Sequence, residues 1–289
     1  MQSIHISNSC LVQLPVRQPR EPRERFVRYY RDLYSLHGKA LSEDAFLSGS
    51  QYSYSELGDC VLSTYFQDDV IKNIDLLCIV TWAHEFDPDY ASMGAYFAHH
   101  YQFDGKIFDV GDQGSIGFHT AIDLIKKYLE TSSLQCALVL LMEQTTIPGE
   151  KDQSVLPIYN AAFGVLISKN TFTLKNNDHY EIIASGIEQR QKILGMDSFI
   201  LSLCANYSIP RSQLKLIIKD NNFISCEEMT NLKTSTISIN FVVNDPGIFP
   251  FILYLHELLE GRQAAEYVLM IDEDAESTDI GYLLIRSRA

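Results

Sequence analysis

The chain has 289 residues, of which 46% are hydrophobic and 21% charged, a composition typical of a globular protein with a buried core. Its formal net charge of −14 excludes a general nucleic-acid or anionic-membrane surface, because both require a positive field. No stretch approaches about 18 consecutive apolar residues, so we expect no membrane span. The first residues also lack the charged start and long apolar run of a signal peptide, and we therefore expect a cytoplasmic protein.

The six cysteines are widely scattered and form no CxxC pair. No Cys/His spacing suits zinc, and the acidic residues after His84 are adjacent loop positions that rarely converge on one ion. Several cysteines lie in apolar runs, which indicates free, buried thiols in a reducing compartment. We therefore expect no metal site.

Apolar patterns predict strands and helices that alternate along the chain. Short apolar runs predict strands over residues 4–14, 75–80, 105–110, 135–142, 161–168, 181–186, 214–219, 267–272 and 281–285. Amphipathic spacing predicts helices over residues 26–36, 54–66, 91–101, 115–130, 198–207 and 249–259. Residues 15–25 contain three prolines and several arginines, which indicates a surface connection. The alternation in two successive halves predicts a layered α/β architecture.

A glycine-rich turn links the predicted strand 105–110 to the predicted helix 115–130. It runs Gly111-Asp112-Gln113-Gly114-Ser115 and delivers one small residue, Ser115, to the start of the helix. The free N–H groups and the positive dipole end of a helix suit a developing oxyanion. Ser115 is therefore a candidate nucleophile. The alternative is an N-cap serine, because serine is favoured at that position.

Four segments resemble, in order and spacing, the β-ketoacyl-ACP synthase III branch of the thiolase-like superfamily. They are Asp75-Leu76-Leu77 before Thr81, the strand and elbow over 108–115, the strand 137–144, and the segment 210–218. The resemblance implies a five-layered α/β/α/β/α thiolase-like fold built of two similar halves. We place these halves at residues 1–175, which carry the nucleophile elbow, and at residues 176–289, which are shortened.

The resemblance also implies a dimer joined through central strands. It implies chemistry on acyl thioesters of coenzyme A or acyl carrier protein, which would be substrates rather than bound cofactors. In such enzymes a cysteine takes the acyl group, while a histidine and an asparagine activate the attack or polarise the second substrate.

The site residues depart from this pattern. Ser115 stands where the cysteine is expected, and the family's His-x-x-Asn falls on residues 219–222, so Lys219 or Asp220 occupies the histidine position. The second polar residue falls on Asn240, in an expected turn whose glycine is replaced by Ile239. A buried lysine can act as a base when its pKa is depressed, whereas a solvated loop is the alternative for Lys219 and Asp220. Asn240 suits an oxyanion donor and equally a turn.

Two further features are candidates for holding the substrate. Arg17, Arg20 and Arg28 belong to a cluster of six arginines, and the planar guanidinium suits the phosphates of coenzyme A or an acidic carrier protein. The alternative is a solvated, charged face. Trp82 follows a predicted strand in a region that, by the resemblance, approaches both the site and the dimer contact. Its alternative is a packed aromatic at the rim.

Two functions follow from these patterns. The first is a catalytically degenerate ketosynthase III-like subunit in an acyl-chain pathway of polyketide or fatty-acid type, which dimerises with an active, cysteine-bearing homologue. The second is an active acyltransferase that uses Ser115 as acyl acceptor. The degenerate subunit is favoured, because the nucleophile, the histidine and the turn glycine of the family are all replaced. We expect a homodimer or heterodimer with residues 105–110 at its interface, a possible acyl carrier protein as partner, and no nucleic-acid or membrane partner.

Overall fold

The computed structural model describes residues 3–41, 44, 49–67, 73–83, 85, 87, 89, 92–111, 113–146, 157–169, 179–219, 225–234, 237–242, 247–262, 265–274 and 279–288. The first half contains β1 (His5–Leu14), α1 (Glu24–Leu36), α2 (Tyr54–Gln67), β2 (Leu76–Thr81), α3 (Met93–His100), β3 (Lys106–Val110), the 3-10 turn η4 (Gly114–Ile116), α4 (Gly117–Thr131), β4 (Cys136–Glu143) and β5 (Asn160–Ser168). The second contains β6 (Tyr180–Gln189), η6 (Arg190–Lys192), α5 (Met196–Asn206), η7 (Arg211–Gln213), β7 (Leu214–Lys219), α6 (Cys226–Thr234), β8 (Ser238–Val242), α7 (Phe249–Leu259), β9 (Tyr267–Glu273) and β10 (Asp279–Ser287).

The strands repeat one topology twice. The sheet order is β3-β2-β4-β5-β1-β6-β10-β9-β7-β8. Read outward from its centre, β1-β5-β4-β2-β3 matches β6-β10-β9-β7-β8. The parallel pairs β2/β3 and β2/β4 of the first half correspond to β7/β8 and β7/β9 of the second. The two halves are joined by a short antiparallel pairing of β1 with β6, at His5↔Glu181 and Ile6↔Tyr180.

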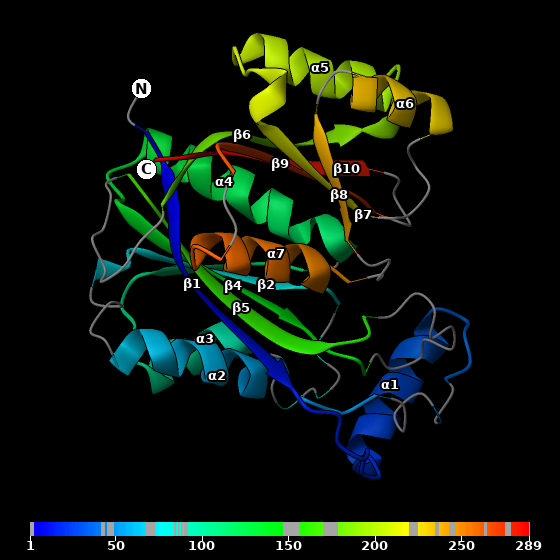
Figure 1. The fold of residues 1–289 in the computed structure, drawn as a ribbon. Coiled ribbons are helices and arrows are strands. Elements are labelled where there is room, and N and C mark those ends of the chain that lie inside the picture. Colours follow the sequence, from blue (N-terminus) through cyan, green and yellow to red (C-terminus); the bar gives the residue numbers. More distant parts are fainter. Residues whose placement is uncertain are drawn as a thin grey trace.

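The chain forms five layers, which Figure 1 shows from one side. Helices α2 and α3 cover the outer face of the first half-sheet, and α5 and α6 cover the outer face of the second. Helices α4 and α7 lie between the two half-sheets, where one large apolar cluster includes Phe118, Phe163, Phe251 and Leu283. Every residue of β2, β4 and β5 is buried, as expected for strands covered on both faces. The five-layered α/β/α/β/α prediction is therefore confirmed.

The predicted elements are present, with ends shifted by a few residues, and two elements were missed. Helix α6 has a weak apolar stripe, and β8 is a short edge strand. The expected turn at Asn240 is wrong, because Asn240 lies inside β8 and pairs with Ile217 of β7. Alternating apolar residues in Ile237-Ser238-Ile239-Asn240-Phe241 favour a strand over a turn. The expected boundary between the halves, at 175/176, lies outside the described residues.

Candidate active site

The elbow between β3 and α4 places Ser115 in η4, two residues before Gly117, the first residue of α4. Ser115 is 2% exposed, and α4 is one of the two helices of the central layer (Figure 1). Gly114 has φ +52°, and a Cβ added there would collide with the carboxylate of Asp274. The left-handed backbone favours glycine, and a side chain at this position would have to displace the Asp274 carboxylate. The sequence pattern thus predicts the position of Ser115 correctly, while its role stays a prediction.

His119, a polar residue of α4, lies one helical turn beyond Ser115. His119 is 1% exposed, and its ring packs edge-on against Phe118 and Phe251 at centroid distances of 6.0 and 6.4 Å. A Cβ built on Gly281 of β10 would lie 2.5 Å from Cδ2 of His119. The imidazole therefore rests on the backbone of β10. Because helical side chains lean toward the N-terminus of their helix, the ring also leans toward Ser115.

Asp272 of β9 is a fully buried acid that the sequence analysis did not single out. It is 0% exposed and pairs in register with Gly281. Directly paired residues point to the same face of a sheet, with Cβ atoms about 5 Å apart. Since Gly281 faces His119, the Asp272 carboxylate faces α4 as well. The only signal in the sequence is an acid that ends the apolar run from Val268 to Ile271.

Glu143 holds the equivalent position in the first half. It ends β4 and is 1% exposed, and its Oε1 accepts a hydrogen bond from the backbone N–H of Ile248 at the start of α7. A Cβ on Gly247 would lie 2.6 Å from Glu143 Oε2. Two residues earlier in each strand, Leu141 and Met270 both pack in the central cluster. Glu143 and Asp272 therefore face the starts of α7 and α4, respectively.

An acidic side chain thus lies beside the start of each central helix, α4 and α7. The positive end of a helix is a natural binding site for an anion. At α7 this position is filled by Glu143, and beside η4 the carboxylate of Asp274 lies against Gly114. Burial raises the pKa of the neighbouring Glu273; Arg190 opposes this shift, and Asp272 and Asp274 add to it. The elbow around Ser115 therefore has the Asp274 carboxyl group beside Gly114 and the buried Asp272 on the neighbouring strand.

The predicted residues of the second half are only partly described. Asn240 is half-buried and shares the sheet face of its partner Ile217, which packs in the central cluster, so its side chain points toward the layer of α4 and α7. The described residues show no hydrogen bond between Asn240 and Ser115. Lys219 ends β7, but its side chain lies outside the described part of the chain, as does the whole of Asp220.

Two of the predicted substrate-holding arginines, Arg17 and Arg20, lie in the segment between β1 and α1, and the third, Arg28, lies in α1. Arg17 is engaged within the chain: its guanidinium donates to both carboxylate oxygens of Glu56 at 3.0 Å and stacks on Tyr52 at 3.8 Å. Arg20 is exposed and exchanges backbone hydrogen bonds with the Gln51 side chain. Arg28 is exposed on α1. Of these three, Arg20 and Arg28 present guanidinium groups to an approaching anion.

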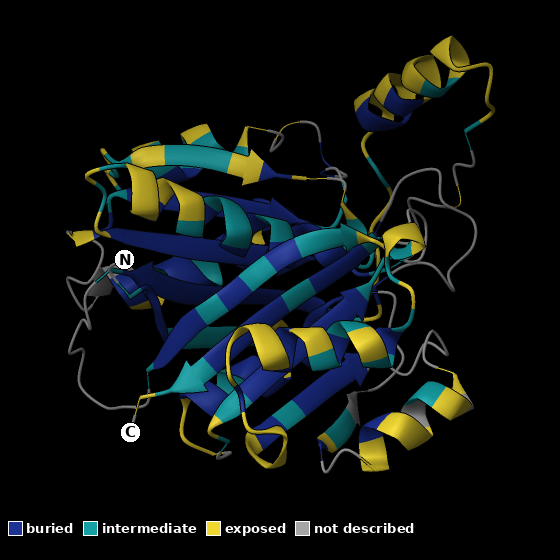
Figure 2. Ribbon diagram, turned by 90° about the horizontal axis from the view of Figure 1, so that it is seen from above, coloured by how far each residue is buried: buried dark blue, intermediate teal, exposed yellow. Residues whose placement is uncertain are grey.

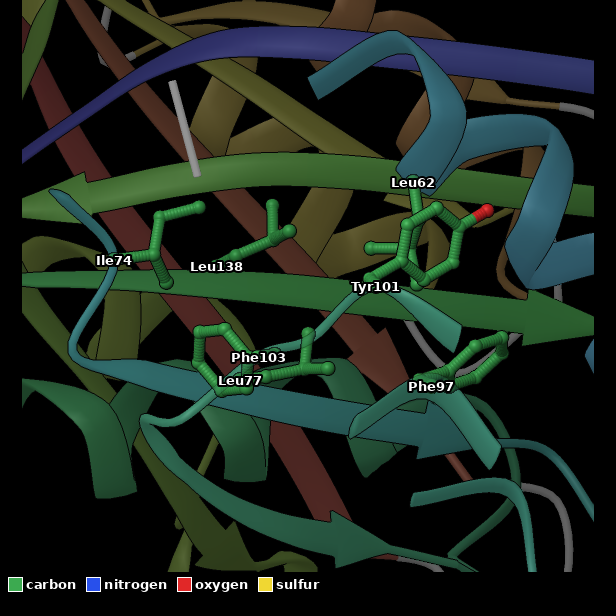
Figure 3. Close-up of a pocket in the computed structure, with 7 residues that line it drawn as sticks. All are labelled: Leu62, Ile74, Leu77, Phe97, Tyr101, Phe103 and Leu138. Carbon is green, nitrogen blue, oxygen red and sulfur yellow. The ribbon is translucent and has the colours of Figure 1, made fainter. Parts of the chain in front are cut away.

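The other predicted contact, Trp82, follows β2 and is half-buried. An apolar pocket lies elsewhere, between the first half-sheet and the helices α2 and α3 (Figure 3). Its lining includes Leu62, Leu77, Phe97 and Leu138. It belongs to the outer apolar cluster, on the opposite sheet face from Ser115, so it offers no wall of the candidate site.

Burial raises the pKa of each of the five described thiols. Burial raises the pKa of Cys78 far above its usual range and that of Cys136 to about 12, in each case with a nearby Asp adding to the effect. Among the residues with described side chains, no group of three or more His, Cys, Asp or Glu could hold a metal ion. No described helix is both long and apolar enough to cross a bilayer.

Comparison with known proteins places the fold. No family model matches the sequence, and no curated protein sequence matches it. Among solved structures, 3-oxoacyl-[acyl-carrier-protein] synthase III from Aquifex aeolicus VF5 aligns with a TM-score of 0.63 at 10% identity, over 98% of this chain and 99% of that one. The acyltransferase ChlB3 gives a TM-score of 0.64 at 13% identity, over 98% and 97%.

An OleA variant from Xanthomonas campestris aligns with a TM-score of 0.61 at 12% identity, over 99% of this chain and 98% of that one. These likenesses span both halves of the chain, including the elbow and the central helices. The chain therefore has the thiolase-like fold of the β-ketoacyl-ACP synthase III enzymes.

Proposed function

We propose that the chain is a ketosynthase III-like subunit with a degenerate active site, which dimerises with a cysteine-bearing homologue in an acyl-chain pathway of the cytoplasm. The observation that carries the proposal is the chemistry at the elbow. A serine occupies the nucleophile position, and buried carboxylates lie at the starts of both central helices.

These carboxylates oppose acyl transfer at Ser115. Attack on a thioester creates an oxyanion, which enzymes stabilise with preorganised N–H donors in a dry site. Here the Ile248 N–H is already bonded to Glu143, and Asp274 lies against Gly114, next to Ser115. An oxyanion that forms at Ser115 would face like-charge repulsion from the half-buried Asp274 carboxylate, which raises the barrier. Serine is also a weak nucleophile unless a base removes its proton.

The edge strand β3 supports the dimer in this proposal. It pairs with β2 on one side and ends the sheet on the other. Phe108 of β3 packs against Tyr128 of α4 at 5.7 Å, and Tyr128 is 47% exposed. An edge strand presents unpaired backbone groups and is a template for another chain. Pairing of β3 with the partner subunit would cover both the edge and this aromatic pair.

One observation favours the second candidate, an active acyltransferase. His119 is buried one helical turn beyond Ser115 and lies against Gly281, whose strand partner is the buried Asp272. A serine, an imidazole and a carboxylate in that order are the components of nucleophile activation. In this alternative Ser115 takes an acyl group from coenzyme A or acyl carrier protein. Arg20, Arg28 and Trp82 would then hold the donor, and Asn240 with Lys219 or Asp220 would act on the second substrate.

Sedimentation velocity and enzyme assay separate the two candidates. The degenerate-subunit proposal predicts a stable complex of this chain with the cysteine-bearing homologue. It also predicts that Ser115→Ala leaves the turnover of that complex unchanged, because the chemistry occurs on the partner. An unchanged complex whose turnover falls by about a hundredfold with Ser115→Ala would instead establish the acyltransferase, since loss of a nucleophile has at least that effect.

A further inference from the structure

Helix α1 buries little of its surface. Together with the residues that lead into it, residues 15–36, it forms a segment that we call the basic arm. Only Phe26, Val27 and Tyr30 of α1 are buried. Figure 2 shows α1 standing apart from the sheet layers, with exposed residues along most of its length.

The exposed face of α1 carries an apolar stripe. Tyr29 is 50% exposed, Leu33 36% and Leu36 81%. Their spacing, i, i+4 and i+7, places all three on one side of the helix. Three large apolar side chains in one row differ from the single apolar residues that are normal on a surface. Such a row on a projecting helix indicates a face that packs against another chain.

The charge of the arm selects the kind of surface that it fits. The arm contains six arginines and three acidic residues, a net charge of +3, whereas the remaining 267 residues contain 17 basic and 34 acidic residues, a net charge of −17. Arg28 is exposed beside the stripe, and the described residues give it no ion pair. Arg17, Arg23 and Arg25 already pair with Glu56 and Asp89 of this chain. The exposed Arg20 and Arg28 therefore make the arm complementary to an acidic surface, such as the body of a subunit with this chain's own composition.

The arm is fixed beside the free edge of the sheet. The Tyr30 hydroxyl donates to the Glu85 carbonyl at 2.6 Å, and Arg23 and Arg25 both pair with Asp89. Both partners follow β2, the strand that pairs in parallel with the edge strand β3. The arm thus projects from the corner at which β2 and β3 end, next to the edge that the proposed dimer covers.

We propose that the basic arm clasps the partner subunit of the dimer, with Tyr29, Leu33 and Leu36 packed on that subunit and Arg28 over its acidic surface. This inference rests on the proposed function, because it takes the partner to be a second thiolase-like subunit. It adds a contact outside the sheet edge, made by a helix of which only Phe26, Val27 and Tyr30 are buried.

The test compares two sets of exposed residues in the full-length dimer. The variant Tyr29→Ser/Leu33→Ser/Leu36→Ser removes the stripe, and Leu194→Ser/Tyr207→Ser is the matched control, since Leu194 and Tyr207 are 104% and 44% exposed in the second half. Both should keep the melting temperature of the isolated wild-type chain, because none of the five changed side chains belongs to the buried core. We expect the stripe variant to raise the dimer dissociation constant by about tenfold or more, and the control to leave it unchanged.

Photo-cross-linking identifies the protein that packs against the exposed face of α1. A photoreactive residue at position 36 should cross-link to the partner subunit, and one at position 194 should not. Cross-links from position 36 to a carrier protein, or only to the same chain, would overturn the clasp. Tyr128→Glu, next to the edge strand, separates the two proposals. A dimer weakened by Tyr128→Glu but not by the stripe variant overturns the clasp alone, whereas a monomeric wild-type chain in the presence of its homologue overturns both.

Discussion

The contact between His119 and Gly281 gives the sharpest test of the geometry around Ser115. A Cβ at position 281 would lie 2.5 Å from His119 Cδ2 and 2.7 Å from its Cγ, well inside van der Waals contact. The ring has little room to move, because it packs between Phe118 and Phe251 in the core. Overpacking of this kind typically costs about 1–3 kcal/mol, so Gly281→Ala should destabilise the protein by that amount.

A double-mutant cycle assigns the cost to His119. In the His119→Ala background the ring is absent, and the new methyl group enters the space that it leaves. Gly281→Ala should then be neutral or stabilising by about 0.5 kcal/mol, because alanine also restricts the unfolded chain. The assay is urea unfolding followed by circular dichroism for the wild type, both single variants and the double variant. If Gly281→Ala lowers the free energy of unfolding equally in the wild type and in His119→Ala, the imidazole does not lie against β10. The proximity of Asp272 to His119 would then be refuted as well.

Two other predictions concern buried carboxylates. Glu143→Leu should destabilise the fold by about 1–3 kcal/mol, because it leaves the Ile248 N–H at the start of α7 without its acceptor. Thermal unfolding measures the loss of stability, and an unchanged melting temperature would contradict the hydrogen bond between Glu143 and Ile248. Burial raises the pKa of Glu181, but hydrogen bonds from Ser3, Arg286 and Arg288 outweigh it and lower the pKa to about 2. A carboxyl group whose pKa is lower in the folded than in the unfolded protein stabilises the fold above the unfolded-state pKa, and this stabilisation is lost as the pH falls. Between pH 5 and pH 2 the free energy of unfolding should therefore fall by on the order of 2 kcal/mol less in Glu181→Gln than in the wild type. Parallel acid-unfolding curves for the two proteins would contradict this.

The sequence could predict the frame of the site because local patterns determine it. The glycine-rich run before Ser115 and the amphipathic stretch after it identify the elbow and α4 without knowledge of the rest of the chain. The apolar run over 137–142 identifies β4 as a buried strand in the same way. Periodicity, turn chemistry and helix-start preferences act over a few residues, so they can be read directly from the sequence.

The surroundings of Ser115 could not be predicted, because they depend on contacts between the halves. Glu143 and Ile248 are 105 residues apart, and nothing in either segment indicates the other. From the sequence alone, Asp272 is only the polar end of a strand. Its pairing with Gly281, seen in the structure, shows that it faces α4. The resemblance predicts a turn at Asn240, whereas the alternating apolar residues around it form β8.

The mass of each subunit after exposure to acyl donors tests the central claim most directly. The chain and its cysteine-bearing homologue would be incubated together with a panel of acyl-CoAs and acyl carrier proteins, and intact masses recorded for both subunits. The degenerate-subunit proposal predicts one acyl group on the homologue and none on this chain. An acyl adduct on this chain that disappears with Ser115→Ala would contradict it and establish Ser115 as a nucleophile.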